Sequence, residues 1–351
     1  MLTTTADAER AAGPRATGPD QPAQPHELKL PLTVLSRLRC PCCRGQLRAD
    51  GEALRCLEAE CATRFPVVDG IPVLINEQRS VFAISDFLER RATTFSLRPR
   101  PFERLLAGAL DRLPSISHAV NADRNYARLG ELLASATPVA DVLVVGGSVL
   151  GAGMETFASN SSVQLIATDV SFGPCTAVIC DAHDLPFADG SFDGVVVQAV
   201  LEHVVDPTRC VEEIHRVLKG RGVVYAETPF MQQVHMGPYD FTRFTHSGHR
   251  RLFRWFEEVE SGAVCGPGMA LAWAYQYFLL SFATSRLVRG LLRGFASLTA
   301  FPLKYVDHYL LQRRGAIDAA SGCYFIGRKS EELFTDRDLI RYYKGAVGVA
   351  K

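Results

Sequence analysis

The amino-acid sequence predicts a doubly wound α/β domain that follows a small β module. Residues 193–198 are a short apolar run typical of a buried strand, and residues 222–227 form a second such run. Between them, residues 207–218 repeat apolar side chains at helical spacing, so the three segments predict a strand, a crossover helix and a parallel strand. Nearer the N-terminus, two cysteine pairs and an Asp-Gly dipeptide within residues 32–75 indicate the β module.

The crossover helix carries signals at both ends. Asp206 is expected to cap its N-terminus, and Gly220 stands where a helix normally ends. In a doubly wound sheet, ligands bind in the crevice at the carboxyl ends of the strands. Asp181, residues 198–203 and residues 227–229 are therefore the first places to look for functional side chains.

Composition limits the functional classes. The chain has 351 residues, enough for about two to three domains. Its 38 Lys and Arg residues balance 38 Asp and Glu residues, so no overall field favours nucleic acid. Residues 1–28 are rich in Ala, Pro, Thr and Gly without the apolar core of a signal peptide, which predicts a disordered tail and a cytoplasmic protein.

The β module offers four thiolates in two pairs, Cys40 with Cys43 and Cys56 with Cys61. Tetrahedral zinc needs four such soft ligands, delivered by two tight turns. The Asp-Gly dipeptide at 69–70 lies between two apolar runs and predicts a hairpin. Because so short a module has little apolar surface to fold on, we predict a structural Zn²⁺ rather than four reduced cysteines without metal.

A glycine-rich turn follows the apolar run at 141–145, where absent side chains let a ligand approach the backbone. A second predicted strand, residues 163–168, ends in Asp169, placed to accept hydrogen bonds from a ribose. A third, residues 177–180, ends in Asp181. The candidate cofactor-binding residues are Gly146, Gly147, Ser148, Gly151, Asp169, Asp181, Ala182 and Gln198.

Further motifs follow in a fixed order. They are DAHDLPF at 181–187, DGSFD at 189–193, LEH at 201–203 and ExxRVL at 213–218. With the glycine-rich turn, they resemble the class I S-adenosylmethionine-dependent methyltransferases, especially the branch that modifies quinones, sugars and other small molecules. The β module resembles the short zinc-ribbon proteins that accompany tRNA and other methyltransferases.

This resemblance implies S-adenosylmethionine as the cofactor and a seven-stranded Rossmann-like sheet whose final strand, here near residues 321–327, is antiparallel. It also implies that Asp169 holds the ribose and that Asp181 lies beside the adenine amino group. The chain departs from the family at two positions. Val144 replaces an acidic residue, and Ser148 replaces a glycine.

Two histidines are candidates to take a proton from an acceptor hydroxyl, because an imidazole titrates near working pH. His203 belongs to the LEH motif, and His235 follows the strand predicted at 222–227. The nearby side chains that could orient a substrate or the imidazole are Tyr239, Asp240 and Arg243. The alternative is that Asp240 and Arg243 pair with each other and only fix the loop.

An insertion at residues 266–317 interrupts the predicted domain. Its helical pattern places Arg286, Arg289 and Arg293 on one face and apolar side chains largely opposite. This arrangement is typical of a helix that rests on a membrane, here through residues 286–304, or that packs on a neighbouring domain. The Gly-Pro-Gly break at 266–268 leaves the apolar stretch too short for a confident membrane span.

The predicted organisation has six parts. They are a tail (1–28), a zinc ribbon (29–76), a helical connector (77–136), a methyltransferase core (137–265 with 318–330), a helical insertion (266–317) and a C-terminal tail (331–351). The predicted activity is methyl transfer to a hydroxyl of a small, glycosidic or lipid-linked molecule. The alternatives are an RNA or protein methyltransferase that uses the ribbon for binding, a non-catalytic scaffold and a nicotinamide dehydrogenase.

Overall fold

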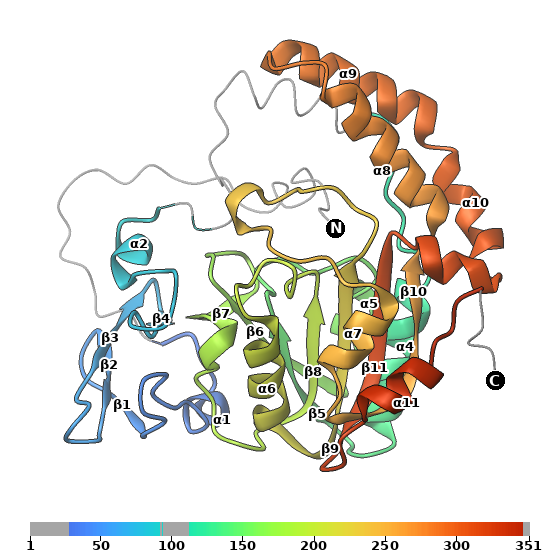
Figure 1. The fold of residues 1–351 in the computed structure, drawn as a ribbon. Coiled ribbons are helices and arrows are strands. Elements are labelled where there is room, and N and C mark those ends of the chain that lie inside the picture. Colours follow the sequence, from blue (N-terminus) through green and yellow to red (C-terminus); the bar gives the residue numbers. More distant parts are fainter. Residues whose placement is uncertain (1–27, 92, 94–111, 347–351) are drawn as a thin grey trace.

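A computed structural model of the protein describes residues 28–91, 93 and 112–346. The predicted N-terminal tail lies outside these residues except for Leu28, as do parts of the connector and of the C-terminal tail. Within them, the chain forms one eleven-stranded sheet with the order β1-β2-β3-β4-β7-β6-β5-β8-β9-β11-β10 (Figure 1).

Seven of these strands form the predicted Rossmann-like sheet. Neighbouring strands are parallel from β7 to β9, and β11 is antiparallel to both of its neighbours, as the sequence predicts. The seven strands are β5 (Ala140–Val145), β6 (Val163–Asp169), β7 (Thr176–Cys180), β8 (Phe192–Gln198), β9 (Leu218–Pro229), β10 (Phe256–Cys265) and β11 (Gly322–Lys329).

The central unit is β8, the crossover helix α6 (Pro207–Val217) and β9. The Asp206 side chain accepts a hydrogen bond from the Arg209 backbone N–H, so this residue caps the helix. Gly220, in contrast, does not end it. The helix stops at Val217, and Gly220 lies inside β9, because Leu218 already pairs with Phe192 of the neighbouring strand.

The zinc-ribbon segment extends the same sheet. Its strands are β1 (Leu47–Ala49), β2 (Ala53–Cys56), β3 (Arg64–Val68) and β4 (Ile71–Leu74). Asp69 and Gly70 both have positive φ, as a tight β3–β4 hairpin requires. The register of β4 against β7 is parallel, with Val73 opposite Ile179, so the ribbon and the core share backbone hydrogen bonds.

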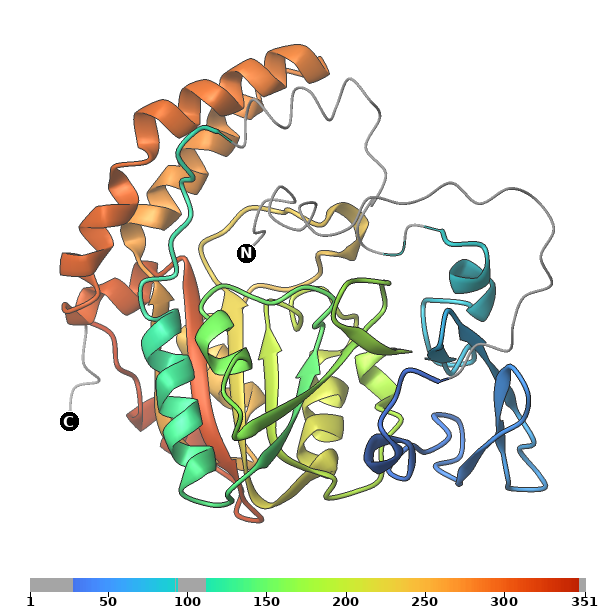
Figure 2. The same cartoon turned by 180° about the vertical axis from the view of Figure 1, so that it is seen from behind.

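Helices cover both faces of the sheet (Figures 1 and 2). The side chains of β8 alternate between two apolar clusters, with Val195 and Val197 in one and Val196 in the other. The shorter and flanking helices are α1 (Leu32–Leu35), α2 (Ile84–Leu88), α4 (Ala122–Ala134), α5 (Glu155–Ala158), α7 (His246–Leu252) and α11 (Asp336–Arg341). β8 is therefore buried on both faces, which explains its uninterrupted apolar run.

The insertion forms an arm of three helices, α8 (Pro267–Leu280), α9 (Arg286–Ala300) and α10 (Leu303–Leu310). Both views show α8 and α9 extending together beyond the carboxyl-end edge of the sheet (Figures 1 and 2). Among the described residues, no helix is long and apolar enough to cross a membrane.

The apolar face of α9, predicted to rest on a membrane or to pack on a neighbouring domain, is largely exposed among the described residues. The face of α9 that is buried carries small residues, including Gly290 and Gly294, which allow close approach to α8. Leu287, Leu291 and Phe295 are instead more than half exposed, at 55%, 64% and 52%.

Candidate functional site

The main cavity lies at the carboxyl ends of β5 to β8 and encloses about 770 Å³ of empty space, part of it open to solvent. Four predicted cofactor-binding residues line it, namely Gly146, Asp169, Asp181 and Ala182. Gly146 has φ 72°, and a Cβ there would lie 2.2 Å from a Val200 methyl, so only glycine fits this turn.

The other four candidates lie behind the cavity wall. Gly147 packs against the Val144 side chain, and Gly151 packs against the Gln198 amide. Gln198 is held by Tyr126, the Ala152 carbonyl and Glu227, so its polar atoms serve an internal network. Ser148 acts through its backbone N–H, which donates to Asp169 at 3.0 Å. Gly147, Ser148 and Gly151 shape the glycine-rich loop, and Gln198 ends β8. None of these four residues lines the cavity.

Asp169 ends β6 with its side chain at the cavity. Burial raises the pKa of its carboxyl, while hydrogen bonds from the Ser148 backbone act in the opposite direction. The bond from Ser148 occupies Oδ2. A carboxylate oxygen carries more than one lone pair, so the group can still accept from a bound ligand hydroxyl.

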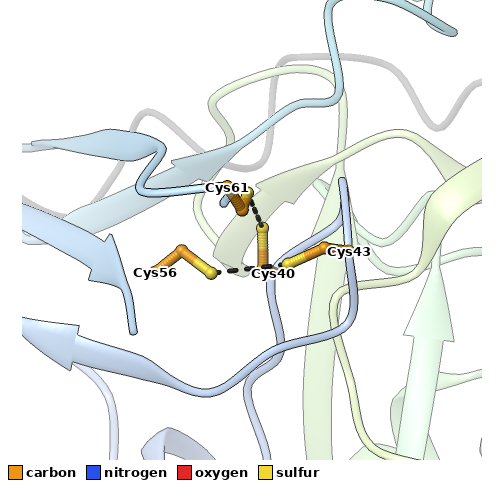
Figure 3. Close-up of side chains that lie close together, drawn as sticks. All are labelled: Cys40, Cys43, Cys56 and Cys61. Carbon is orange, nitrogen blue, oxygen red and sulfur yellow. Dashed lines mark hydrogen bonds between the residues drawn. The ribbon is translucent and has the colours of Figure 1, made fainter. Parts of the chain in front are cut away.

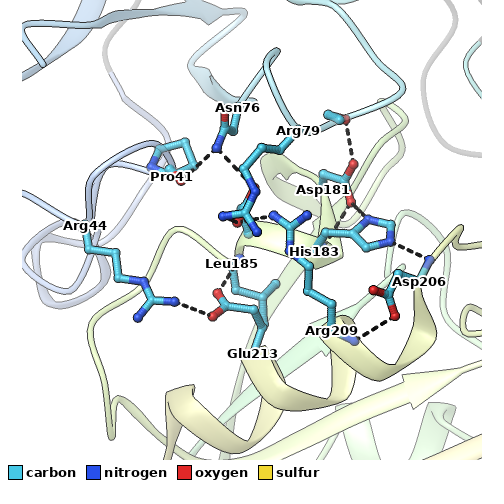
Figure 4. Close-up of polar contacts among 12 residues, drawn as sticks. Pro41, Arg44, Asn76, Arg79, Asp181, His183, Leu185, Asp206, Arg209 and Glu213 are labelled. Atoms are coloured by element: carbon cyan, nitrogen blue, oxygen red, sulfur yellow. Dashed lines mark hydrogen bonds and ion pairs between the residues drawn. The ribbon is translucent and has the colours of Figure 1, made fainter.

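Asp181 lies where the core meets the segment that follows the ribbon (Figure 4). Its Oδ2 accepts from the Ser80 hydroxyl at 2.5 Å, and its Oδ1 accepts from the His183 backbone N–H at 3.0 Å. Burial alone would raise the pKa of this carboxyl, but the hydrogen bond and charge of His183 lower it. The carboxylate is thus anchored on two sides.

Val81 and Phe82, which follow Ser80, line the cavity. Sequence reasoning missed these residues, because they lie about a hundred positions before Asp181 and carry no motif. Only the pairing of β4 with β7 brings them to the cavity. The ribbon is therefore part of the pocket's support.

Further polar contacts bind the ribbon to the core. Arg44 of the ribbon pairs with Glu213 at 3.0 Å, and the Asn76 amide contacts Asp184 (Figure 4). Arg37 pairs with Asp141 at 2.6 Å. Glu213 is the first residue of the ExxRVL motif, so this part of the motif serves packing and the ribbon contact.

The four predicted zinc ligands converge (Figure 3). The sulfur atoms of Cys40 and Cys61 are 3.7 Å apart, those of Cys43 and Cys56 are 3.4 Å apart, and all four lie within 4.8 Å of one another. A tetrahedral Zn²⁺ with bonds of about 2.3 Å needs sulfur separations of about 3.8 Å, so the cluster fits a structural zinc. Zinc would also favour the thiolate forms, whereas burial alone raises the pKa of Cys40.

The part of the cavity around His203 is here called its acceptor half. His203 lines the cavity, and His235 lies outside the lining but contacts the His203 ring. Their rings are perpendicular, with centroids 4.9 Å apart. Burial, followed by the charge of His235, lowers the pKa of His203 to about 4, and burial also lowers the pKa of His235. Both imidazoles are therefore neutral at neutral pH.

The structure matches the alternative in which Asp240 and Arg243 fix the loop. Arg243 contacts both Asp240 oxygens and donates to three backbone carbonyls, while the His235 backbone N–H donates to Asp240. Burial would raise the pKa of Asp240, but the hydrogen bonds from Arg243 and His235 lower it to about 2. Tyr239 stacks on Phe82, and its carbonyl accepts from His203.

Glu202, between β8 and α6, has a different environment. Its side chain is fully buried, and neither carboxylate oxygen has a hydrogen-bond partner among the described residues. Burial raises the pKa of this carboxyl to about 7. Glu227, also buried, instead bonds to Tyr225 and Gln198. Sequence reasoning named Glu202 only as part of the LEH motif.

A glycine turn, two strand-end acids and the sheet order define a nucleoside-binding α/β domain. Comparison with known families is consistent with this class, because residues 147–226 match the model of the methyltransferase domain. The chain therefore carries a class I S-adenosylmethionine-dependent methyltransferase domain, and the ribbon cysteines fit a structural zinc.

The curated relatives match only part of the chain. A ubiquinone/menaquinone biosynthesis C-methyltransferase of Geotalea uraniireducens is 34% identical over 110 residues, which are 28% of this chain and 46% of the relative. An uncharacterised transposon protein of Streptomyces fradiae is 30% identical over 136 residues, covering 39% of this chain and 36% of the relative. The chain thus spans less than half the length of these two relatives.

Solved structures show similar folds at low identity. A phosphoethanolamine N-methyltransferase of Haemonchus contortus is 15% identical with a TM-score of 0.42, covering 81% of this chain and 71% of the other. A 1,6-didemethyltoxoflavin N1-methyltransferase of Burkholderia thailandensis is 15% identical with a TM-score of 0.36, covering 68% of this chain and 95% of the other.

Proposed function

We propose that the protein transfers the methyl group of S-adenosylmethionine to a hydroxyl of a small, glycosidic or lipid-linked molecule. The observation that carries this proposal is the placement of Asp169, Asp181 and the Gly146 turn around one cavity. The sulfonium carries a good leaving group, so the protein's main tasks are to align the acceptor with the methyl carbon and to help remove a proton. His203 and His235 border the acceptor half and are our candidates for the second task.

Calorimetry tests the cofactor assignment. S-adenosylmethionine and S-adenosylhomocysteine should bind with one site per chain, whereas NAD⁺ should not bind. Tight binding of NAD⁺ with none of S-adenosylmethionine would support the dehydrogenase alternative. Failure of all three ligands to bind folded protein would support the non-catalytic scaffold, for which Val144 in place of an acid is the main argument.

The helical arm supports a lipid-linked acceptor. Between Glu260 and Asp307 the chain has no acidic residue but carries three arginines, Arg286, Arg289 and Arg293. Its fourth cation, Lys304, is buried and donates to the Ser115 carbonyl. The arm also exposes apolar side chains along one stripe of α9 and on α8, including Phe278 at 60%, and Phe282, just after α8, is 75% exposed. Apolar exposure combined with one sign of charge is typical of a surface that lies on an anionic bilayer.

The base of the arm also contacts the acceptor half. The Tyr277 hydroxyl donates to the Val234 carbonyl at 2.9 Å, and the Trp273 ring contacts His235. An acceptor held in a bilayer would therefore reach the cavity along α8. Arg289 has a separate structural role, because it donates to the Leu280 and Ala283 carbonyls at the end of that helix.

Flotation with vesicles tests the membrane proposal. The protein should float with vesicles containing phosphatidylglycerol at low salt and less with phosphatidylcholine alone. Leu291→Glu with Phe295→Glu should abolish flotation, whereas Leu57→Glu, at an exposed apolar position in the ribbon, should not. The arm would have no membrane role if wild-type protein stayed in the bottom fraction of the gradient, or if the double variant floated as much as the wild type does.

A further inference from the structure

A second cluster of possible metal ligands, separate from the zinc ribbon, consists of Glu202, His203 and His235. One ligand atom from each residue lies within 4.8 Å of the other two. Glu202 and His203 follow β8, and His235 lies in the loop after β9. Because these strands are parallel neighbours, their carboxyl ends bring the three residues to the same edge of the sheet.

The Glu202 carboxylate faces this cluster without a partner. It is fully buried, its oxygens accept no hydrogen bond from the described residues, and Nε2 of His203 lies 3.6 Å from Oε1. An ionised carboxylate is strongly unfavourable in such a place unless it is paired or coordinates a metal. The charge of Arg243 acts on Glu202, but no described residue donates a hydrogen bond to either side-chain oxygen, so a directly bound cation would satisfy this group.

Both imidazoles are oriented as metal ligands commonly are. Nδ1 of His203 lies 2.7 Å from the Tyr239 carbonyl oxygen, and Nδ1 of His235 lies 3.2 Å from the Gln233 carbonyl oxygen. When its Nδ1–H donates to Tyr239, His203 keeps a free lone pair on Nε2. At His235, Nδ1 also lies 3.4 Å from Nη2 of Arg243, so Nε2 keeps its lone pair in the tautomer whose Nδ1–H donates to Gln233. Metal-bound histidines almost always donate their other N–H in this way, which fixes the ring and the tautomer.

We propose that Glu202, His203 and His235 bind one divalent first-row transition-metal ion through a carboxylate oxygen and two imidazole nitrogens. This donor set suits ions such as Zn²⁺, Fe²⁺ and Co²⁺. Three protein ligands leave coordination positions open for water or an acceptor oxygen, unlike the four thiolates of the ribbon.

The catalytic role of the ion rests on the proposed methyl transfer. Since His203 also lines the cavity, the ion borders the place where an acceptor would lie. In this arrangement the two histidines help remove the proton through the ion and do not take it themselves. An acceptor hydroxyl bound to the ion loses its proton to water more readily, because the cation stabilises the oxygen anion. That oxygen forms a bond to the methyl carbon as the carbon–sulfur bond breaks, leaving a neutral ether and neutral S-adenosylhomocysteine.

Cobalt titration of the full chain, with zinc already in the ribbon, tests the site. Co²⁺ should bind with one equivalent and give d–d absorption without thiolate-to-cobalt charge-transfer bands. Glu202→Gln and His235→Ala should each weaken binding at least about tenfold. His308→Ala, which removes an exposed histidine of α10, should bind as the wild type does.

Zinc content and circular dichroism establish that each variant is folded with its ribbon intact. No Co²⁺ uptake by the wild type, uptake with thiolate bands alone, or equal affinity in Glu202→Gln and His235→Ala would each overturn the proposal. The titration contains no S-adenosylmethionine. Its failure would therefore leave the cofactor assignment intact, and failure of the cofactor calorimetry would leave the metal site intact.

Discussion

Asp169 and Asp181, on the cofactor half of the cavity, both accept hydrogen bonds from the protein, whereas Glu202 on the acceptor half accepts none from the described residues. Burial acts to raise the pKa of all three carboxyls. Hydrogen bonds from other residues act against it at Asp169 and Asp181, whereas at Glu202 its own backbone and the charge of Arg243 act against it only in part. The cofactor half is thus built before any ligand arrives. In our proposals, an ion bound at Glu202 completes the acceptor half, which would place cofactor affinity in one half and turnover in the other.

The largest expected effect comes from disrupting the zinc ribbon. The ribbon supports the part of the cavity lined by Asp169 and Asp181, which is called the cofactor half. Cys61→Ser should lose zinc and disorder the ribbon, because structural zinc sites contribute about 10 to 16 kcal/mol to folding. S-adenosylmethionine binding should then be lost, since β4, Ser80 and Phe82 hold this half. Elemental analysis and calorimetry measure both effects.

Cys42→Ser is the matched control, because Cys42 is an exposed thiol outside the four-cysteine cluster. It should retain zinc and cofactor affinity. A Cys61→Ser protein that binds S-adenosylmethionine as tightly as the wild type would show that the ribbon does not support the pocket.

The next effect concerns turnover. His235→Ala should lower the rate of methyl transfer about a hundredfold to ten-thousandfold, because it removes help with the acceptor proton. Affinity for S-adenosylmethionine should stay unchanged, since His235 lies outside the cavity lining. Release of S-adenosylhomocysteine with the wild type's acceptor measures the rate. Near-normal turnover would assign the proton to another group and leave alignment as the main mechanism.

Two substitutions of similar chemistry should change stability in opposite directions. Asp181→Asn should lower the free energy of unfolding by about 1 to 3 kcal/mol, because it weakens the bonds with Ser80 and His183. Glu202→Gln, in protein dialysed free of all but ribbon zinc, should raise it or leave it unchanged, because an unpaired buried charge is removed. Urea unfolding measures both. Equal losses would mean that Glu202 has partners after all.

A pH-dependent effect on α7 provides a reference outside both halves. Burial lowers the pKa of His249, on α7, from 6.5 to about 3, so the folded state keeps it neutral while the unfolded state takes up a proton below about pH 6.5. The free energy of unfolding should therefore fall as the pH drops from about 6.5 to about 3, by at most about 1.4 kcal/mol per pH unit from this residue. His249→Leu should flatten the slope in urea unfolding at several pH values. An unchanged slope would assign the acid sensitivity to other groups.

The sequence predicted the core sheet well because its strands are buried on both faces and leave uninterrupted apolar runs, as at β8. It also predicted the cysteine cluster, because the pairs are local in sequence. A helix end was misplaced at Gly220, since strand pairing at Leu218 overrode the glycine signal. Local patterns therefore fixed the elements better than their boundaries.

The site was predicted less completely, because two of its features depend on long-range contacts. The parallel pairing of β4 with β7 places Val81 and Phe82 at the cavity, and nothing in their local sequence indicates this. Likewise, the LEH motif does not reveal that the Glu202 side chain is buried without a partner. The apolar stripe of α9 was visible, but its exposure depends on which face of the helix packs on α8.

The central claim is that Asp169 holds the ribose of S-adenosylmethionine in the cofactor half. Calorimetry of Asp169→Ala against the wild type tests it most directly. A hydrogen bond to a buried charged group contributes about 1.5 to 3 kcal/mol, so the account predicts a loss of affinity of roughly tenfold or more in a variant that keeps its zinc. Unchanged affinity in a folded Asp169→Ala protein would place the nucleoside elsewhere and contradict the account.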